Sequence, residues 1–112
     1  MEATAKLRFA RGSARKARLV LDTIRYKPVS EAVNILRFSQ RRAAGIIYKL
    51  LESAVANARQ QDPKIDLTKV FVSQAMADEG PQMKRFMPRA QGRAFMIRKQ
   101  TCHISLGIQT LE

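Results

Sequence analysis

The most reactive residue types in the sequence are one cysteine and one histidine, Cys102 and His103, which adjoin near its C-terminal end. A Cys–His dyad for nucleophilic catalysis requires the two side chains to lie within hydrogen-bond reach. The segment around them alternates apolar and polar residues, and consecutive side chains of a strand point to opposite faces. A lone Cys and a lone His also make no zinc set. We therefore expect no enzyme, no metal site and no cofactor.

Binding to phosphate is the other chemistry that the residue types favour. The 112 residues include 21 Lys and Arg against 9 Asp and Glu, a formal net charge of +12. Such an excess is typical of nucleic-acid-binding domains. An anionic membrane surface is the alternative, but it usually requires one basic amphipathic helix with apolar anchors, and here the cations are spread over several segments. We expect a nucleic-acid partner and no membrane.

The length of the chain predicts a single domain, 1–112. One cysteine permits no intramolecular disulfide, and no apolar run approaches the ~18 residues of a membrane span. The N-terminal residues have no apolar segment of the kind that a signal peptide carries. These features predict a reducing, cytoplasmic compartment.

A stretch at about 80–100 carries six basic residues and no acidic one. A dense turn signal at 88–92, with β-prone apolar residues on both sides, predicts a long β-hairpin whose tip lies near Arg89 to Arg93. Arms of about eight residues would reach roughly 25 Å. Two isolated strands are marginal in water, so we expect the arm to order against nucleic acid. A solvated basic loop is the alternative, and the aromatic, Met and Ile residues disfavour it.

A first strand is predicted over 3–10, because apolar and polar residues alternate there. Leu7 and Phe9 would face the core, and Lys6 and Arg8 would face outward together. The Arg-Gly-Ser step that follows would end this strand.

Three helices are predicted next. The first, over 14–26, begins after Ser13, a good N-cap, and shows an apolar stripe at helical spacing. The second is capped by Ser30 and reaches about residue 38. The third and longest covers 41–60. Its Gly45 indicates close packing, since glycine inside a helix costs about 1 kcal/mol relative to alanine.

The globular body is predicted to comprise residues 1–79 and 101–112, approximately. Two further strands complete it. One is predicted over 69–77, with Gln74 on the core side and Ala75 on the other, and one over 101–108. Because the hairpin joins them, these strands should pair antiparallel. The predicted fold class is α+β, with three helices packed on a small antiparallel three-stranded sheet and one long protruding β-hairpin.

Basic residues crowd two predicted helix N-termini, where the helix dipole prefers anions. They are Arg15, Lys16 and Arg18 in the first helix and Arg41 and Arg42 in the third. A phosphate bound at these ends would turn an unfavourable arrangement into a favourable one. Solvated cations on exposed faces are the alternative.

Several stretches resemble one family across nearly the whole chain. They are SARKARLVLDTIR at 13–25, LLESAVANA at 50–58, and DEGPQMKRFMPRAQGRA at 78–94 followed by KQTCHISL at 99–106. In this order they resemble large-subunit ribosomal protein L-twenty-two in its bacterial and organelle form, and the last two together are highly specific.

The resemblance implies a structural constituent of the large ribosomal subunit. It would bind the large-subunit ribosomal RNA, aid assembly and contact neighbouring ribosomal proteins. Its body would sit near the exit of the nascent-chain tunnel, and its hairpin would line the tunnel wall near the macrolide site. The nascent chain would be a passing partner. The location would be the cytoplasmic ribosome, or the stroma or matrix for an organelle-encoded chain.

Two groups of candidate site residues follow. The ribosomal-RNA-binding group comprises Lys6, Arg8, Arg11, Arg15, Lys16, Arg18, Arg25, Lys27, Arg41, Arg42, Lys84, Arg85, Arg98, Lys99 and His103. The tunnel-lining hairpin tip comprises Met83, Lys84, Arg85, Pro88, Arg89, Ala90, Gln91, Gly92 and Arg93.

Four residues depart from the family pattern, and the mildest change is Ala14, which stands where Pro is common at the first helical position. Tyr26 stands where Gly is common after the first helix, and a left-handed cap is strained for Tyr, so we expect a different local turn. Gln100 stands where a basic residue is usual. Cys102 stands where Ser is usual, which indicates a small buried side chain.

A DNA-binding regulator is the alternative function, with the first two helices as a helix-turn-helix. Its contacts would be Arg15, Lys16, Arg18 and Arg25. The second helix has only Arg37 as a cation and is too apolar to read a groove, so we expect no DNA partner.

Overall fold

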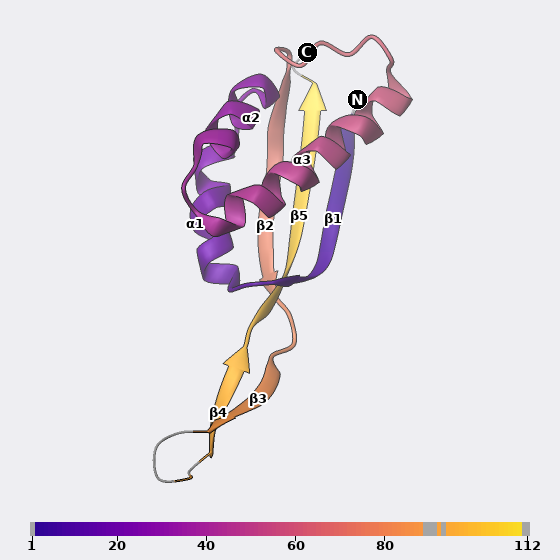
Figure 1. Cartoon of the computed structure of the whole chain (residues 1–112). Coiled ribbons are helices and arrows are strands. Elements are labelled where there is room, and N and C mark those ends of the chain that lie inside the picture. Colours follow the sequence, from indigo (N-terminus) through magenta and orange to yellow (C-terminus); the bar gives the residue numbers. More distant parts are fainter. Residues whose placement is uncertain (1, 89–91, 93, 111–112) are drawn as a thin grey trace.

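A three-stranded antiparallel sheet and three helices form the body of the protein, and a two-stranded hairpin projects from one end of it (Figure 1). The structure is a computed structural model that describes residues 2–88, 92 and 94–110. The sheet has the order β1-β5-β2, with β1 at Glu2–Arg11, β5 at Thr101–Thr110 and β2 at Val70–Glu79. Both outer strands pair antiparallel with β5. The predicted fold class is confirmed.

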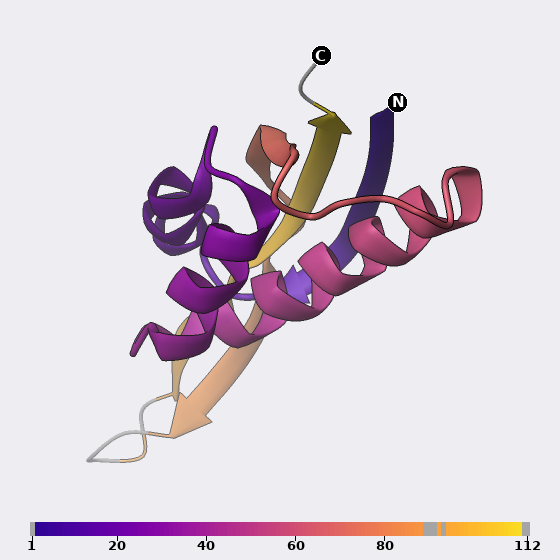
Figure 2. The same ribbon diagram turned by 90° about the horizontal axis from the view of Figure 1, so that it is seen from above.

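The helices α1 (Ala14–Ile24), α2 (Val29–Phe38) and α3 (Arg42–Gln61) cover one face of this sheet (Figure 2). Apolar residues at helical spacing turn toward the strands, which bury alternate residues against them. The largest fully buried side chains are Leu21, Ile24, Ile47, Leu51, Ile104, Leu106 and Ile108. Within the described residues, no helix lies on the other face of the sheet.

The hairpin consists of β3 (Met83–Pro88) and β4 (Ala94–Lys99), paired from Met83 opposite Lys99 to Pro88 opposite Ala94. Each arm has six residues rather than the predicted eight. The molecule measures 63 Å along its longest axis against 24 and 17 Å across. Of the predicted tip, Arg89, Ala90, Gln91 and Arg93 lie outside the described residues.

Three hydrogen bonds fasten the hairpin to the body. The Gly80 N–H donates to the carbonyl oxygen of Thr101 at 2.9 Å, and the Thr101 hydroxyl donates to the carbonyl oxygen of Pro81 at 2.6 Å. The Gly12 N–H, in the loop after β1, donates to the carbonyl oxygen of Gln100 at 3.0 Å. Thr101 is only 6% exposed, so this junction is part of the folded body.

Two β-bulges, one in β1 and one in β2, reverse the predicted inward or outward direction of some side chains. In β1, Leu7 pairs with Ile104 and Ala10 with Cys102, so Arg8 and Phe9 both oppose the single residue His103. The prediction that Phe9 faces the core is therefore wrong, and its side chain is 62% exposed.

The second bulge lies in β2, where the register shifts between Val72 and Gln74. Ala75 is consequently buried and Gln74 exposed, the reverse of the prediction. The alternation to either side of each bulge is regular, so the extra residue could be located only from the partner strand.

The turn between α1 and α2 also differs from the predictions. Pro28 is the N-cap of α2, so the predicted cap at Ser30 is wrong. Tyr26 adopts a left-handed conformation with φ 63°, so the expected change of turn is wrong as well. Its N–H donates to the carbonyl oxygen of Val72, and the Val72 N–H donates to that of Lys27, at 2.9 and 3.0 Å. These bonds to β2 compensate the backbone strain of a tyrosine at this position.

Gly45 was predicted to mark close packing in α3, and this is wrong. The residue is exposed, and a Cβ built there would meet no atom within 4 Å. The residues that do pack tightly on this helix are its buried alanines, Ala44, Ala54 and Ala58. Each end of the helix lies within one residue of the predicted bounds, 41–60.

Candidate nucleic-acid interface

A cleft of about 340 Å³ opens where the hairpin leaves the body, and we call it the base cleft. Three parts of the chain form its wall: residues 10–17, from the end of β1 to the start of α1; residues 42–46, at the start of α3; and residues 98–104, from the end of β4 into β5. The lining residues are Ala10, Arg11, Gly12, Ser13, Lys16, Ala17, Arg42, Ala43, Ile46, Arg98, Lys99, Gln100, Cys102 and Ile104.

The base cleft has a strongly positive character. Its five cations, Arg11, Lys16, Arg42, Arg98 and Lys99, are all exposed and all belong to the predicted binding group. Within the described part of the chain, the ion pairs are Arg25–Asp22 and Lys27–Glu31, so no carboxylate neutralises the cleft. No side chain caps the start of α1 or α3, and the dipoles of both helices add to the positive potential.

A second, smaller hollow of about 240 Å³ lies across β1, β5 and the end of β2, and we call it the open-face hollow. The lining residues are Lys6, Leu7, Arg8, Phe9, Asp78, His103, Ile104 and Ser105. It brings together three predicted site residues, Lys6, Arg8 and His103. Lys6 and Arg8 are exposed, as predicted for the outward side of the first strand.

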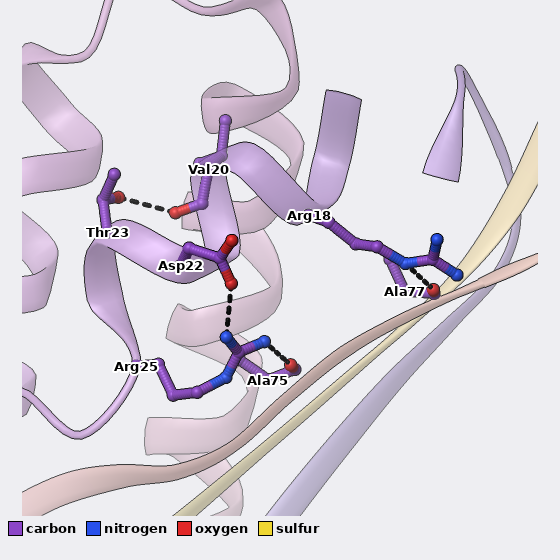
Figure 3. Close-up of polar contacts among 7 residues, drawn as sticks. All are labelled: Arg18, Val20, Asp22, Thr23, Arg25, Ala75 and Ala77. Atoms are coloured by element: carbon purple, nitrogen blue, oxygen red, sulfur yellow. Dashed lines mark hydrogen bonds and ion pairs between the residues drawn. The ribbon is translucent and has the colours of Figure 1, made fainter. Parts of the chain in front are cut away.

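Two predicted cations of α1, Arg18 and Arg25, have partners inside the protein (Figure 3). Arg18 donates from Nε to the carbonyl oxygen of Ala77 at 2.9 Å, and Arg25 donates from Nη2 to that of Ala75 at 2.5 Å. Arg25 also pairs with Asp22 through Nη1. The two arginines thus cover the free edge of β2, a role that an edge strand requires whether or not RNA is present. Their contact with RNA stays a prediction.

The other predicted cations of the body are dispersed. Arg15 is exposed on α1, and Lys27 lies 3.9 Å from a carboxylate oxygen of Glu31. Arg41 is the N-cap of α3, and its N–H donates to the hydroxyl oxygen of Ser39 at 3.3 Å. None of these three lines either cleft.

On the hairpin, Lys84 and Arg85 are exposed and Met83 is half-buried. Arg85 donates from Nη1 to the carbonyl oxygen of Lys84 at 2.9 Å, which holds its guanidinium back along the arm. Gly92, in the tip, has φ 72°, a conformation that glycine adopts without strain. Pro88 ends β3.

Cys102 and His103 point to opposite sides of β5, as predicted. The Cys102 side chain is 2% exposed, and burial raises the pKa of its thiol. His103 is half-buried in the open-face hollow, where its Nδ1 accepts a hydrogen bond from the Phe9 N–H at 3.0 Å. In the described residues, no group of three His, Cys, Asp or Glu side chains could hold a metal ion.

None of the helices formed by residues 14–61 is both long and apolar enough to cross a membrane. Phe9 and Asp78 line the open-face hollow but do not belong to the predicted binding group. No signal within β1 could have found Phe9, since its exposure depends on the bulge opposite His103.

The fold and the two clefts define a small, basic α+β protein with a projecting hairpin. The chain belongs to the family described as ribosomal protein L22p/L17e, whose model matches residues 5–109. This family consists of structural ribosomal proteins and not of enzymes.

Relatives described as large ribosomal subunit protein uL22 match almost the entire chain. The protein of Syntrophotalea carbinolica is 57% identical over 106 residues, which cover 95% of this chain and 96% of the relative. That of Geobacter sulfurreducens is 52% identical over 95% of both chains. That of Caldicellulosiruptor saccharolyticus is 49% identical over 99% of this chain and 90% of the relative.

Proposed function

We propose that this chain binds large-subunit ribosomal RNA, aids assembly of the subunit beside neighbouring ribosomal proteins, and lines the nascent-chain exit tunnel with its hairpin. Its location would then be the ribosome of the cytoplasm. The observation that carries the proposal is the convergence of five cations without carboxylate partners on the base cleft. Three parts of the chain supply these cations, namely residues 11–16, residue 42 and residues 98–99, whereas the cations of a solvated helix face would all come from one helix.

The position of the base cleft supports a role in placing the hairpin. Arg98 and Lys99 belong to β4, whereas Lys16 and Arg42 belong to helices of the body. An RNA phosphate held in the cleft would contact both parts and fix the direction of the arm. It would also relieve the repulsion among the cations, which nothing in the described protein neutralises.

The salt dependence of RNA binding tests the proposal. For binding to a transcript of large-subunit ribosomal RNA, the double variant Lys16→Gln and Arg42→Gln should reduce the slope of log K against log salt by roughly 2, one per lost phosphate contact. The matched control changes Arg37 and Lys49, two exposed cations outside the cleft, to Gln. Equal slopes for the two double variants would reject the base cleft as a phosphate site.

Photo-crosslinking tests the tunnel role. A photoreactive residue in place of Phe86, which is 76% exposed on β3, should capture a stalled nascent chain in assembled subunits. The same residue in place of Lys49 on α3 should not. Capture from neither position, in subunits that contain the protein, would reject the tunnel role and leave the RNA-binding role standing.

A further inference from the structure

Phe9 combines two features that the fold alone does not require. Its backbone is left-handed, with φ 58°, which is rare for a bulky residue. Its ring gains no place in the core, since 62% of the residue is exposed. Backbone strain of this kind persists where the surrounding structure enforces it, and it is frequent at binding sites.

His103 holds Phe9 in this position. The Phe9 N–H donates to His103 Nδ1 at 3.0 Å instead of to a carbonyl oxygen of β5. The two rings meet edge to face, with centroids 4.9 Å apart and planes at 85°. This arrangement fixes the phenyl ring while most of the residue stays exposed, so the ring is a preformed apolar platform rather than a mobile side chain.

The surroundings of the platform match the parts of a nucleotide. Lys6 and Arg8 line the same hollow and are exposed, as a phosphate requires. The Asp78 carboxylate, opposite His103 in the β2–β5 register, can accept a hydrogen bond from an amino group of a base. An aromatic ring beside cations is the common means of holding an unpaired base.

We propose that the open-face hollow binds one unpaired nucleobase of ribosomal RNA, stacked on Phe9, with its phosphate at Lys6 and Arg8. The proposal rests on the RNA-binding function proposed above and adds a base-specific subsite to it. A side chain of a neighbouring protein is the other conceivable occupant. The positive charge of the hollow and of the chain as a whole, +12, favours the nucleotide.

The sequence contains no tryptophan, so a Phe9→Trp variant places a single fluorescent reporter in the hollow. A hexamer of adenylate RNA should quench its emission by stacking. An abasic ribose-phosphate hexamer of equal charge should not. The control variant is Phe38→Trp, since Phe38 is 79% exposed at the end of α2, outside the hollow. Equal quenching by the two hexamers, or in the two variants, would overturn the proposal.

Affinity measurements separate this site from RNA binding in general. Phe9→Ala should weaken binding of the adenylate hexamer roughly 5- to 150-fold, and Phe9→Tyr should restore it. Both should keep the salt dependence of the unaltered protein. If Phe9→Ala binds as well as the unaltered chain, the stacking site is rejected and the phosphate contacts stand. If the unaltered chain does not bind RNA, the proposed function itself fails.

Discussion

The hydroxyl of Thr101 donates a hydrogen bond across 2.6 Å to the carbonyl oxygen of Pro81, and this bond closes the base of the hairpin. The two residues are 20 apart in sequence and lie at the two points where the chain leaves and re-enters the body. The molecule is 63 Å long, and the direction in which the hairpin projects from the body is therefore set by a junction of very few residues.

Thr101→Val should destabilise the protein by about 0.5–1.5 kcal/mol, because valine keeps the shape of the side chain but removes the donor of this part-buried hydrogen bond. Thr101→Ser keeps the hydroxyl and is the matched control. Urea unfolding of the three chains measures the difference. A valine variant as stable as the unaltered chain would show that the bond does not contribute.

Two glycines should respond in opposite directions to alanine. A Cβ at Gly80 would lie 2.6 Å from Thr101 Oγ1, so Gly80→Ala must displace the hydroxyl that closes the hairpin. A Cβ at Gly45 meets nothing within 4 Å, so Gly45→Ala should stabilise α3 by about 0.5–1 kcal/mol. Thermal unfolding should shift downward for the first variant and upward for the second. A shift of the same sign in both would contradict the packing described here.

The sequence predicts those elements whose pattern is local. Cys102, Ile104, Leu106 and Ile108 alternate with His103, Ser105 and Gly107 in the predicted strand 101–108, and all four are buried on β5. Phe9 and Ala75 were assigned to the wrong sides because each follows a bulge, and an extra residue in one strand is defined only by its partner strand. Gly45 was predicted to pack closely and does not, whereas a Cβ at Gly80 would lie 2.6 Å from Thr101 Oγ1, a neighbour that comes from beyond the hairpin.

The candidate site, like the fold, could be predicted from the sequence only in part. The abundance of cations is evident from composition, but their grouping is a product of topology. Arg11 and Arg98 are brought to one cleft by the return of the chain through the hairpin. Arg15 and Arg18 both follow an alanine on α1, yet only Arg18 donates a hydrogen bond to β2 in the described residues. Arg18 makes this contact because of its position on the helix and because the edge strand β2 passes beside it. Its acceptor, Ala77, lies 59 residues further along the sequence.

Removal of the arginines that cover β2 should expose a strand edge. Arg18→Leu and Arg25→Leu should each lower the free energy of unfolding by about 1–2 kcal/mol, since each loses a charge-assisted hydrogen bond to a carbonyl of β2. Together they should promote self-association through the uncovered edge. The control is Arg15→Leu on the same helix, whose side chain makes no hydrogen bond within the described residues. Light scattering that rises equally in the control would reject this explanation.

The buried thiol of Cys102 should make stability depend on pH in the alkaline range. Burial raises the pKa of this thiol above 9.0, the value expected for the unfolded chain. Above that pH the unfolded chain loses the proton while the folded chain keeps it, so the folded state binds more protons and stability falls as pH rises. The thiol's contribution is complete below pH 9 and is lost as pH rises through the folded pKa, with a limiting slope of about 1.4 kcal/mol per pH unit.

Cys102→Ala isolates this effect from the lysines and tyrosines that titrate in the same range. Urea unfolding of both chains at pH 8, 9 and 10 should show the unaltered protein losing more stability than the alanine variant at the upper end. Alkylation should agree, because a thiol that is 2% exposed should react only when the protein unfolds. Parallel pH profiles, or rapid alkylation of the folded chain, would mean that β5 opens readily at Cys102, beside the junction that positions the hairpin.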